Sequence, residues 1–217
     1  MLLLPLILGA VVGFYLHDSI VLRLNLIQAP TPSQTAPNFD KSNNLRVDIN
    51  SLYRENVILL TSALRRIYNK EPYVPDALEA LQENTLDIAD IIGNYYGPEV
   101  RSQYLGLWVS QNRAFVSYAE AVRDKDNNKK AVANKNLNDY VDASLSFWQK
   151  VNPQFDTTSY RPMLADRVSF LRNFVNDLDA SNVSESFKDQ HAAYQQNGKI
   201  ADFLTLSIVK QFANKFK

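Results

Sequence analysis

Apolar residues recur with a period close to 3.6 from Leu45 onward, which is the pattern of amphipathic α-helices. Proline and glycine divide this region, because each tends to end or begin a helix. We expect six or seven helices, at about 45–69, 75–96, 98–123, 131–151, 161–180, 183–196 and 199–216. No alternating β pattern competes with them, so the sequence predicts an all-α, up-and-down antiparallel helical bundle over 45–217.

Two of the predicted boundaries depend on glycine. Gly97 suits the end of one helix and Pro98 the first turn of the next, since proline lacks the amide hydrogen that a first turn does not use. Asn197 and Gly198 together form a turn signal. We therefore expect the last two helices to be separate, with a break at this dipeptide.

The first part of the chain has a different pattern. Residues 2–16 carry no charge, and a second apolar patch follows as far as Ile27. A membrane-spanning helix needs ~17–25 residues, which this segment reaches if the charge of Arg23 extends to the membrane interface. The sequence predicts an N-terminal membrane helix, a signal anchor, over 1–27. A cleaved signal peptide and a buried first helix of a soluble protein are the alternatives.

Residues 28–44 are rich in Pro, Ser, Thr, Gln and Asn and have no apolar period. Such a composition is typical of a linker. We expect three parts: the anchor at 1–27, the linker at 28–44 and the helical domain at 45–217. We further expect this domain to lie on the extracytoplasmic side of a bacterial cytoplasmic membrane, although no Lys or Arg precedes the apolar run to fix its orientation.

The composition excludes several classes of function. The 23 basic and 23 acidic residues balance, so no excess positive charge attracts nucleic acid. Cysteine is absent, which excludes disulfides, thiolate metal sites and thiol catalysis. His191 is the only histidine of the helical domain at 45–217, and no phosphate-binding loop or nucleophile elbow is present. We therefore expect no cofactor and no metal. The absence of these motifs favours a protein that is not an enzyme.

Three strongly polar residues, Asn56, Gln111 and Arg167, fall in the middle of apolar stripes. Their apolar neighbours one turn away are Leu52 and Leu60 for Asn56, Leu107 and Phe115 for Gln111, and Leu164 and Leu171 for Arg167. Buried amide and guanidinium groups need partners, because an unpaired one costs several kcal/mol. These residues are the candidate ligand-binding residues, together with Glu55, the nearest carboxylate for Arg167.

Two interpretations of this cluster stay open. It is either an internal hydrogen-bond network that fixes helix register, or a pocket between helices for a small polar or anionic ligand. By contrast, Glu79, Glu83, Asp87 and Asp90 form an acidic row opposite an apolar stripe. We expect this row to face solvent and not to bind a metal.

The segments DIADIIGNYYG and IVKQFANKF resemble a group of small uncharacterised bacterial all-helical bundle proteins. The resemblance implies a bundle over about 45–216 but no activity. Histidines on the first, third and fifth helices of members imply a buried metal or polar centre. The corresponding positions here are Asn56, Gln111 or Asn112, and Arg167. Asn and Gln are poor transition-metal ligands and Arg is none, so a metal is not expected here.

These observations lead to one expectation and two alternatives. We expect a membrane-tethered, non-catalytic module that binds a small polar ligand or an envelope protein partner. One alternative is a degenerate or unusual enzyme on a helical bundle with a polar interhelical site. The other is a structural subunit of a membrane complex.

Overall fold

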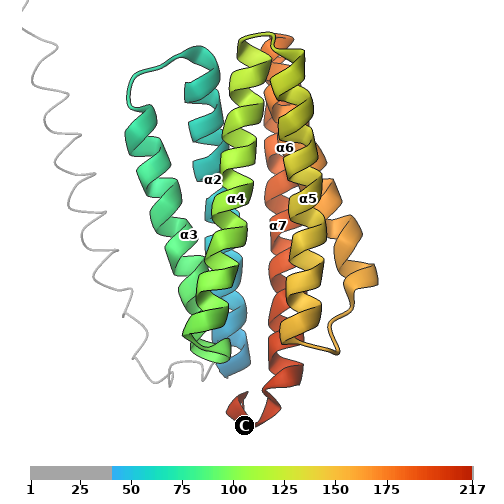
Figure 1. Ribbon diagram of the computed structural model, residues 1–217. Helices are drawn as coiled ribbons and strands as arrows, with labels where there is room; N and C mark the ends of the chain where they lie inside the picture. The colour runs from blue at the N-terminus through green and yellow to red at the C-terminus, as the bar shows by residue number, and fades with distance from the viewer. Residues whose placement is uncertain (1–40, 217) are drawn as a thin grey trace, which may run out of the picture. The chain divides into compact units, whose positions relative to one another are not determined.

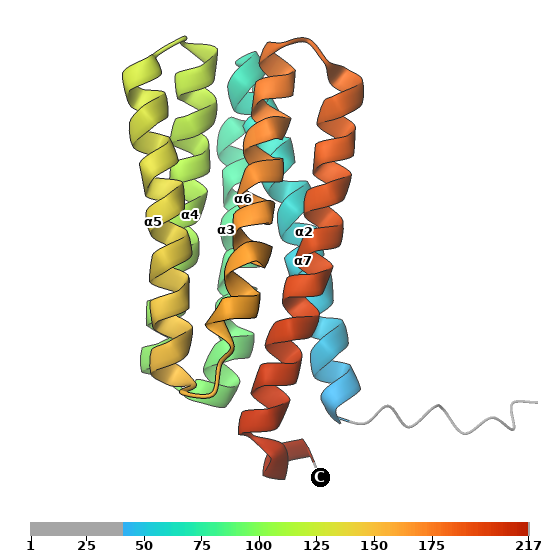
Figure 2. The same ribbon diagram turned by 90° about the vertical axis from the view of Figure 1, so that its right-hand side faces the viewer.

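The computed structural model describes residues 41–216, which form six α-helices and one short 3₁₀-helix. The elements are α2 (Lys41–Asn69), α3 (Val74–Tyr96), α4 (Pro98–Arg123), α5 (Asn127–Val151), α6 (Thr157–Asp179), α7 (Val183–Gln211) and η1 (Ala213–Phe216). Successive helices run in opposite directions (Figures 1 and 2). The predicted all-α bundle is confirmed for this part of the chain, where no strand occurs.

The predicted membrane helix at 1–27 lies outside the described residues, as does the predicted linker up to residue 40. Within 41–216, none of the helices contains a stretch that is both long and apolar enough to cross a bilayer.

Several helix ends match the sequence prediction. Gly97, with φ of 90°, separates α3 from α4, and Pro98 begins α4. Three helices begin about four residues earlier than predicted. In α2, residues 41–44 of the predicted linker are helical. In α5 and α6, Asp126 and Asp156 cap the first turn by accepting hydrogen bonds from backbone amides, of Lys129 at 2.9 Å and of Ser159 at 3.0 Å.

The predicted break at Asn197 and Gly198 is wrong, because α7 runs through both residues without interruption. Both residues are fully inside the structure: Asn197 is 0% exposed, and Gly198 lies against Arg54 of α2. A turn signal is a local preference, and the contacts that α7 makes with α2 and α6 outweigh it. The bundle therefore has one long C-terminal helix where two were expected.

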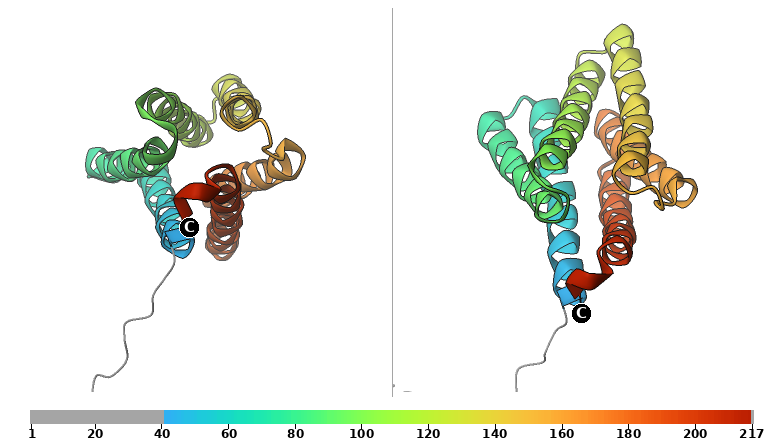
Figure 3. Two further views of the ribbon diagram at one scale, coloured as in Figure 1. Left: turned by 90° about the horizontal axis from the view of Figure 1, so that it is seen from below. Right: turned by 60° about the horizontal axis from the view of Figure 1, so that its bottom comes forward.

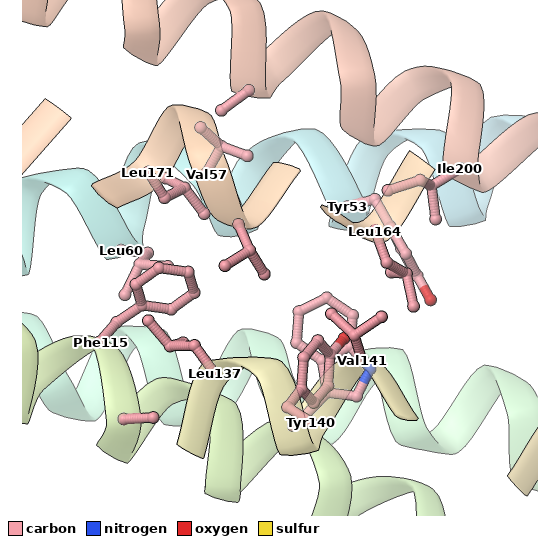
Figure 4. Close-up of a cluster of buried hydrophobic side chains, with 14 of the residues drawn as sticks. Tyr53, Val57, Leu60, Phe115, Leu137, Tyr140, Val141, Leu164, Leu171 and Ile200 are labelled. Atoms are coloured by element: carbon pink, nitrogen blue, oxygen red, sulfur yellow. The ribbon is translucent and has the colours of Figure 1, made fainter. Parts of the chain in front are cut away.

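Helices that are neighbours in sequence pack against each other, and α2 also packs against α4, α6 and α7. The end-on view shows α2 beside α7, so the first and last described helices close the bundle (Figure 3). All six helices contribute to the core. Figure 4 shows part of it, including Val57, Leu60, Phe115, Leu137, Leu171 and Ile200.

Candidate functional site

Arg167 of α6 is the largest charged side chain inside the bundle, with 1% of its surface exposed. Its three guanidinium nitrogens donate to amide oxygens on three other helices. Nε donates to Asn197 of α7 at 2.7 Å, Nη1 to Gln111 of α4 at 2.7 Å, and Nη2 to Asn56 of α2 at 3.0 Å. All three acceptors are completely buried. The guanidinium thus joins four helices at one point.

Each of the three amides that accept from Arg167 donates a further hydrogen bond to a group farther from the guanidinium. Arginine only donates, so each amide must turn its oxygen toward Arg167 and its NH₂ group away. The NH₂ of Asn56 donates to Asn84 at 3.1 Å, and the NH₂ of Gln111 donates to Asn112 at 3.3 Å. The NH₂ of Asn197 donates to the backbone carbonyl of Tyr53. The amide dipoles are therefore aligned in three chains that begin at the cation.

The chains end at groups that accept hydrogen bonds. Asn84 donates to the carbonyl of Leu52 and to the carboxylate of Glu55, both at 3.0 Å. On the other side, Asn112 donates to Thr85 at 3.1 Å, and Thr85 donates to the carbonyl of Leu81 at 2.7 Å. Asn84 and Thr85 are adjacent on α3, so two chains from Arg167 meet on one turn of that helix.

The structure brings Asn56, Gln111 and Arg167 together, as the stripe positions predict. The expected pairing of Glu55 with Arg167 is wrong. Glu55 is exposed, and two amides separate its carboxylate from the guanidinium. The reason is geometric: Glu55 lies at the edge of its stripe, so Asn56 points inward and Glu55 remains at the surface. Within residues 41–216, no carboxylate forms an ion pair with Arg167.

The electrostatics follow from this arrangement. Burial lowers the pKa of Arg167 from its ordinary value of 12.5, and nearby buried tyrosines, Tyr140 first, oppose the change. The guanidinium carbon lies 5.4 Å from the ring centre of Trp108, which suits a cation–π contact. Burial also raises the pKa of Tyr53 and Tyr104, whose hydroxyls are hydrogen-bonded to each other. Every group around Arg167 is therefore neutral at ordinary pH, and its positive charge is compensated by dipoles.

Sequence reasoning missed three members of the network, Asn84, Thr85 and Asn197, and reached Asn112 only as an alternative to Gln111 through the family resemblance. Asn84 and Thr85 lie between Leu81 and Ile88 on the buried side of α3, so they carry the same signal as Asn56. Asn197 has that signal too, between Ala193 and Ala201, but only in a continuous helix. Because a helix break was predicted at this position, Asn197 was not recognised as a buried polar residue.

The network approaches the surface at a groove between α3 and α4, with a cavity volume of about 380 Å³. Asn112 forms part of its wall, and Arg113, Gln82 and Ser117 supply further polar groups. The remaining lining is apolar: Leu78, Leu81, Val109 and Val116. A few polar groups in an apolar wall are typical of small-molecule sites, and the volume falls in their usual range.

The acidic row of α3 faces solvent as predicted, with Glu79, Glu83, Asp87 and Asp90 all exposed. Asp90 forms an ion pair with Arg101. No group of three or more histidine, aspartate or glutamate side chains in residues 41–216 is arranged to hold a metal ion.

Comparisons with models of known protein families, with curated proteins and with solved structures found no match to this chain.

Proposed function

We propose that the helical unit is a non-catalytic module that binds a small organic anion in the α3–α4 groove, and that the N-terminal segment tethers it outside a bacterial cytoplasmic membrane. The tether rests on the uncharged run at 2–16 and the Pro-rich segment that follows. The binding site rests on the chain of contacts from Arg167 through Gln111 to Asn112, which connects a buried cation to the groove.

The amide dipoles in this chain all point the same way. Arg167 polarises Gln111, and the NH₂ of Gln111 in turn polarises Asn112 at the groove wall. Arg113, which is exposed at the same wall, adds a second positive charge. An anion in the groove would therefore lie in a positive field, with apolar residues around its hydrocarbon part.

The same residues support binding better than catalysis. Asn56, Gln111, Asn112 and Asn197 neither titrate nor act as nucleophiles near neutral pH. A guanidinium stays protonated over this range, so it orients or neutralises an anion and does not exchange protons with it.

A thermal-shift measurement on the full chain in detergent tests the proposal, with butyrate, succinate and benzoate as probes. At 100 times the dissociation constant, a bound acid adds about 2.7 kcal/mol, which corresponds to a rise in Tm of about 5–10 °C. We expect Arg113→Gln and Asn112→Asp to remove this rise, the first by deleting a charge and the second by placing a negative charge in the groove. Arg161→Gln, an exposed arginine of α6, is the control.

One specific observation favours a second function. Each guanidinium nitrogen already has an acceptor within the protein, so the network can hold the helices in register without a ligand. In that case the module acts through its surface on a protein partner. If none of the three acids raises the Tm of the wild type, or if Arg161→Gln removes the rise as fully as Arg113→Gln does, the groove proposal is wrong and this second function replaces it.

A further inference from the structure

A second pocket, distinct from the α3–α4 groove, lies where α2 packs against α7. Its cavity volume is about 600 Å³. The polar groups that line it include Arg46, Asn50, Ser51 and Arg54 of α2, and Tyr194 of α7 forms part of its wall. The pocket is located in the first half of α2, near the point where the N-terminal segment joins the helical unit.

Arg54 is held in a fixed position at this pocket. Its guanidinium carbon lies 5.0 Å from the ring centre of Tyr194, a cation–π contact that orients the planar group. On the other side, α7 comes close because residue 198 is glycine. A Cβ at this position would collide with Nη2 of Arg54 and lie 2.8 Å from its Nε. Tyr194 and Gly198 thus position the guanidinium before any ligand binds.

Within residues 41–216, Arg54 has no carboxylate of its own. Its Nε is buried and has no acceptor in residues 41–216, and no ion pair involves its guanidinium there. The nearby carboxylate of Asp202 is already engaged. It accepts two hydrogen bonds from Arg46, at 2.7 and 2.9 Å, and a third from Asn50 at 2.7 Å. Two guanidinium groups therefore share one carboxylate, which leaves one positive charge uncompensated.

We propose that this pocket binds a phosphate group attached to a larger organic molecule. The planar donors of arginine match phosphate oxygens, and Ser51 adds a hydroxyl donor beside Arg54. A cavity of this size holds more than a free ion, and Tyr194 with Val47 supplies an apolar wall for the rest of the molecule. This site is independent of the α3–α4 groove, because no residue is shared between their linings.

The phosphate has two chemical sources, a soluble phosphate ester or the headgroup of a phospholipid. The pocket begins at Asn43, close to the start of the described chain, and the preceding segment is the one we propose to lie at a membrane. A phospholipid headgroup is therefore tested beside the soluble ester. Both sources require the same guanidinium, so the same variants test both.

The experiment measures the affinity of the full chain, in non-ionic detergent, for glycerol phosphate and for mixed micelles that contain phosphatidylglycerol. We expect Arg54→Gln to weaken binding about ten-fold or more, because it deletes the charged donor. Arg65→Gln is the matched control: Arg65 is also on α2 and also stacks on aromatic rings, those of Phe174 and Phe187, but it does not line the pocket. It should leave binding unchanged.

A third variant, Gly198→Ala, keeps the charge of Arg54 but displaces its guanidinium. We expect it to weaken binding nearly as much as Arg54→Gln does. Binding to glycerol phosphate supports a soluble ester. Binding that needs phosphatidylglycerol in the micelles, is weakened by Arg54→Gln and is absent with glycerol phosphate supports a headgroup. The proposal is overturned if neither probe binds the wild type, if Arg65→Gln weakens binding as much as Arg54→Gln, or if Gly198→Ala binds as the wild type does.

Discussion

Two arginines contact the same turn of α7, and they differ in how far their guanidinium groups are paired. Arg167 reaches Asn197 from the core, where each of its three guanidinium nitrogens has an acceptor. Arg54 is half-buried and lies against Gly198, and its Nε has no acceptor in the described part of the chain. Asn197 and Gly198 are adjacent, so one turn of α7 serves both side chains.

The difference shows how position decides what an arginine does. A buried guanidinium must find acceptors within the protein, because water cannot reach it. The amides around Arg167 meet this need and thereby tie five helices together. A half-buried guanidinium faces a smaller desolvation cost, so the protein can hold it unpaired and ready for an anion. We therefore assign to Arg167 the joining of the helices, beside the positive field that we propose it lends to the α3–α4 groove, and to Arg54 direct contact with a ligand.

The largest expected effect comes from Arg167→Met. This change leaves the amide oxygens of Asn56, Gln111 and Asn197 without a donor, and we expect it to lower the free energy of unfolding by about 3 kcal/mol or more. Urea denaturation measures the loss. Arg172→Met is the control on the same helix, since this partly exposed arginine makes a single hydrogen bond to Asn134, and its loss should cost about 1 kcal/mol or less.

The opposite result would also be informative. Replacing buried charged groups by apolar ones of similar size is neutral or stabilising in some proteins. If Arg167→Met is as stable as the wild type, the network does not hold the helices. The assignment of the two arginines then fails, and a ligand-related role for Arg167 gains support.

High pH should act on the buried tyrosines, two of which, Tyr53 and Tyr104, lie near Arg167. Burial raises the pKa of Tyr53 and Tyr104 above the ordinary value of 10.0, and raises that of Tyr96 to about 12. A raised tyrosine pKa means that the folded state favours the neutral phenol. Its contribution to stability is complete below pH 10.0 and is lost as the pH rises toward about 12. We expect urea midpoints to fall across this range, with the tyrosinate absorbance of these buried phenols appearing only as the protein unfolds. Full tyrosinate absorbance near pH 10.0 in the folded protein would contradict the burial of these phenols.

The sequence predicted the core arginine far better than the surface one. A polar residue within an apolar stripe is visible in the sequence, so Asn56, Gln111 and Arg167 were found. Asn197 was missed because Asn-Gly is a turn signal, which its burial against Arg167 overrides. Nothing in the sequence near Arg54 indicates a site, since the position of its guanidinium depends on the absence of a side chain at Gly198, on a helix far away along the chain. The period of apolar residues shows which face of a single helix is buried. It does not show which residues of different helices come into contact when the helices pack.

The smallest expected effect, Gly198→Ala, tests whether that glycine serves Arg54. Alanine within a helix is favoured over glycine by about 1 kcal/mol. Against this gain, the new Cβ pushes the guanidinium away from Tyr194 and removes a cation–π contact of about 0.5–1 kcal/mol. The free energy of unfolding should therefore change by less than about 1 kcal/mol.

In an Arg54→Ala background the collision is absent, and the same change should stabilise the protein by the full helical gain. A double-mutant cycle by urea denaturation measures this coupling. Equal destabilisation in both backgrounds would mean that the spacing of α2 and α7, and not the position of Arg54, requires glycine.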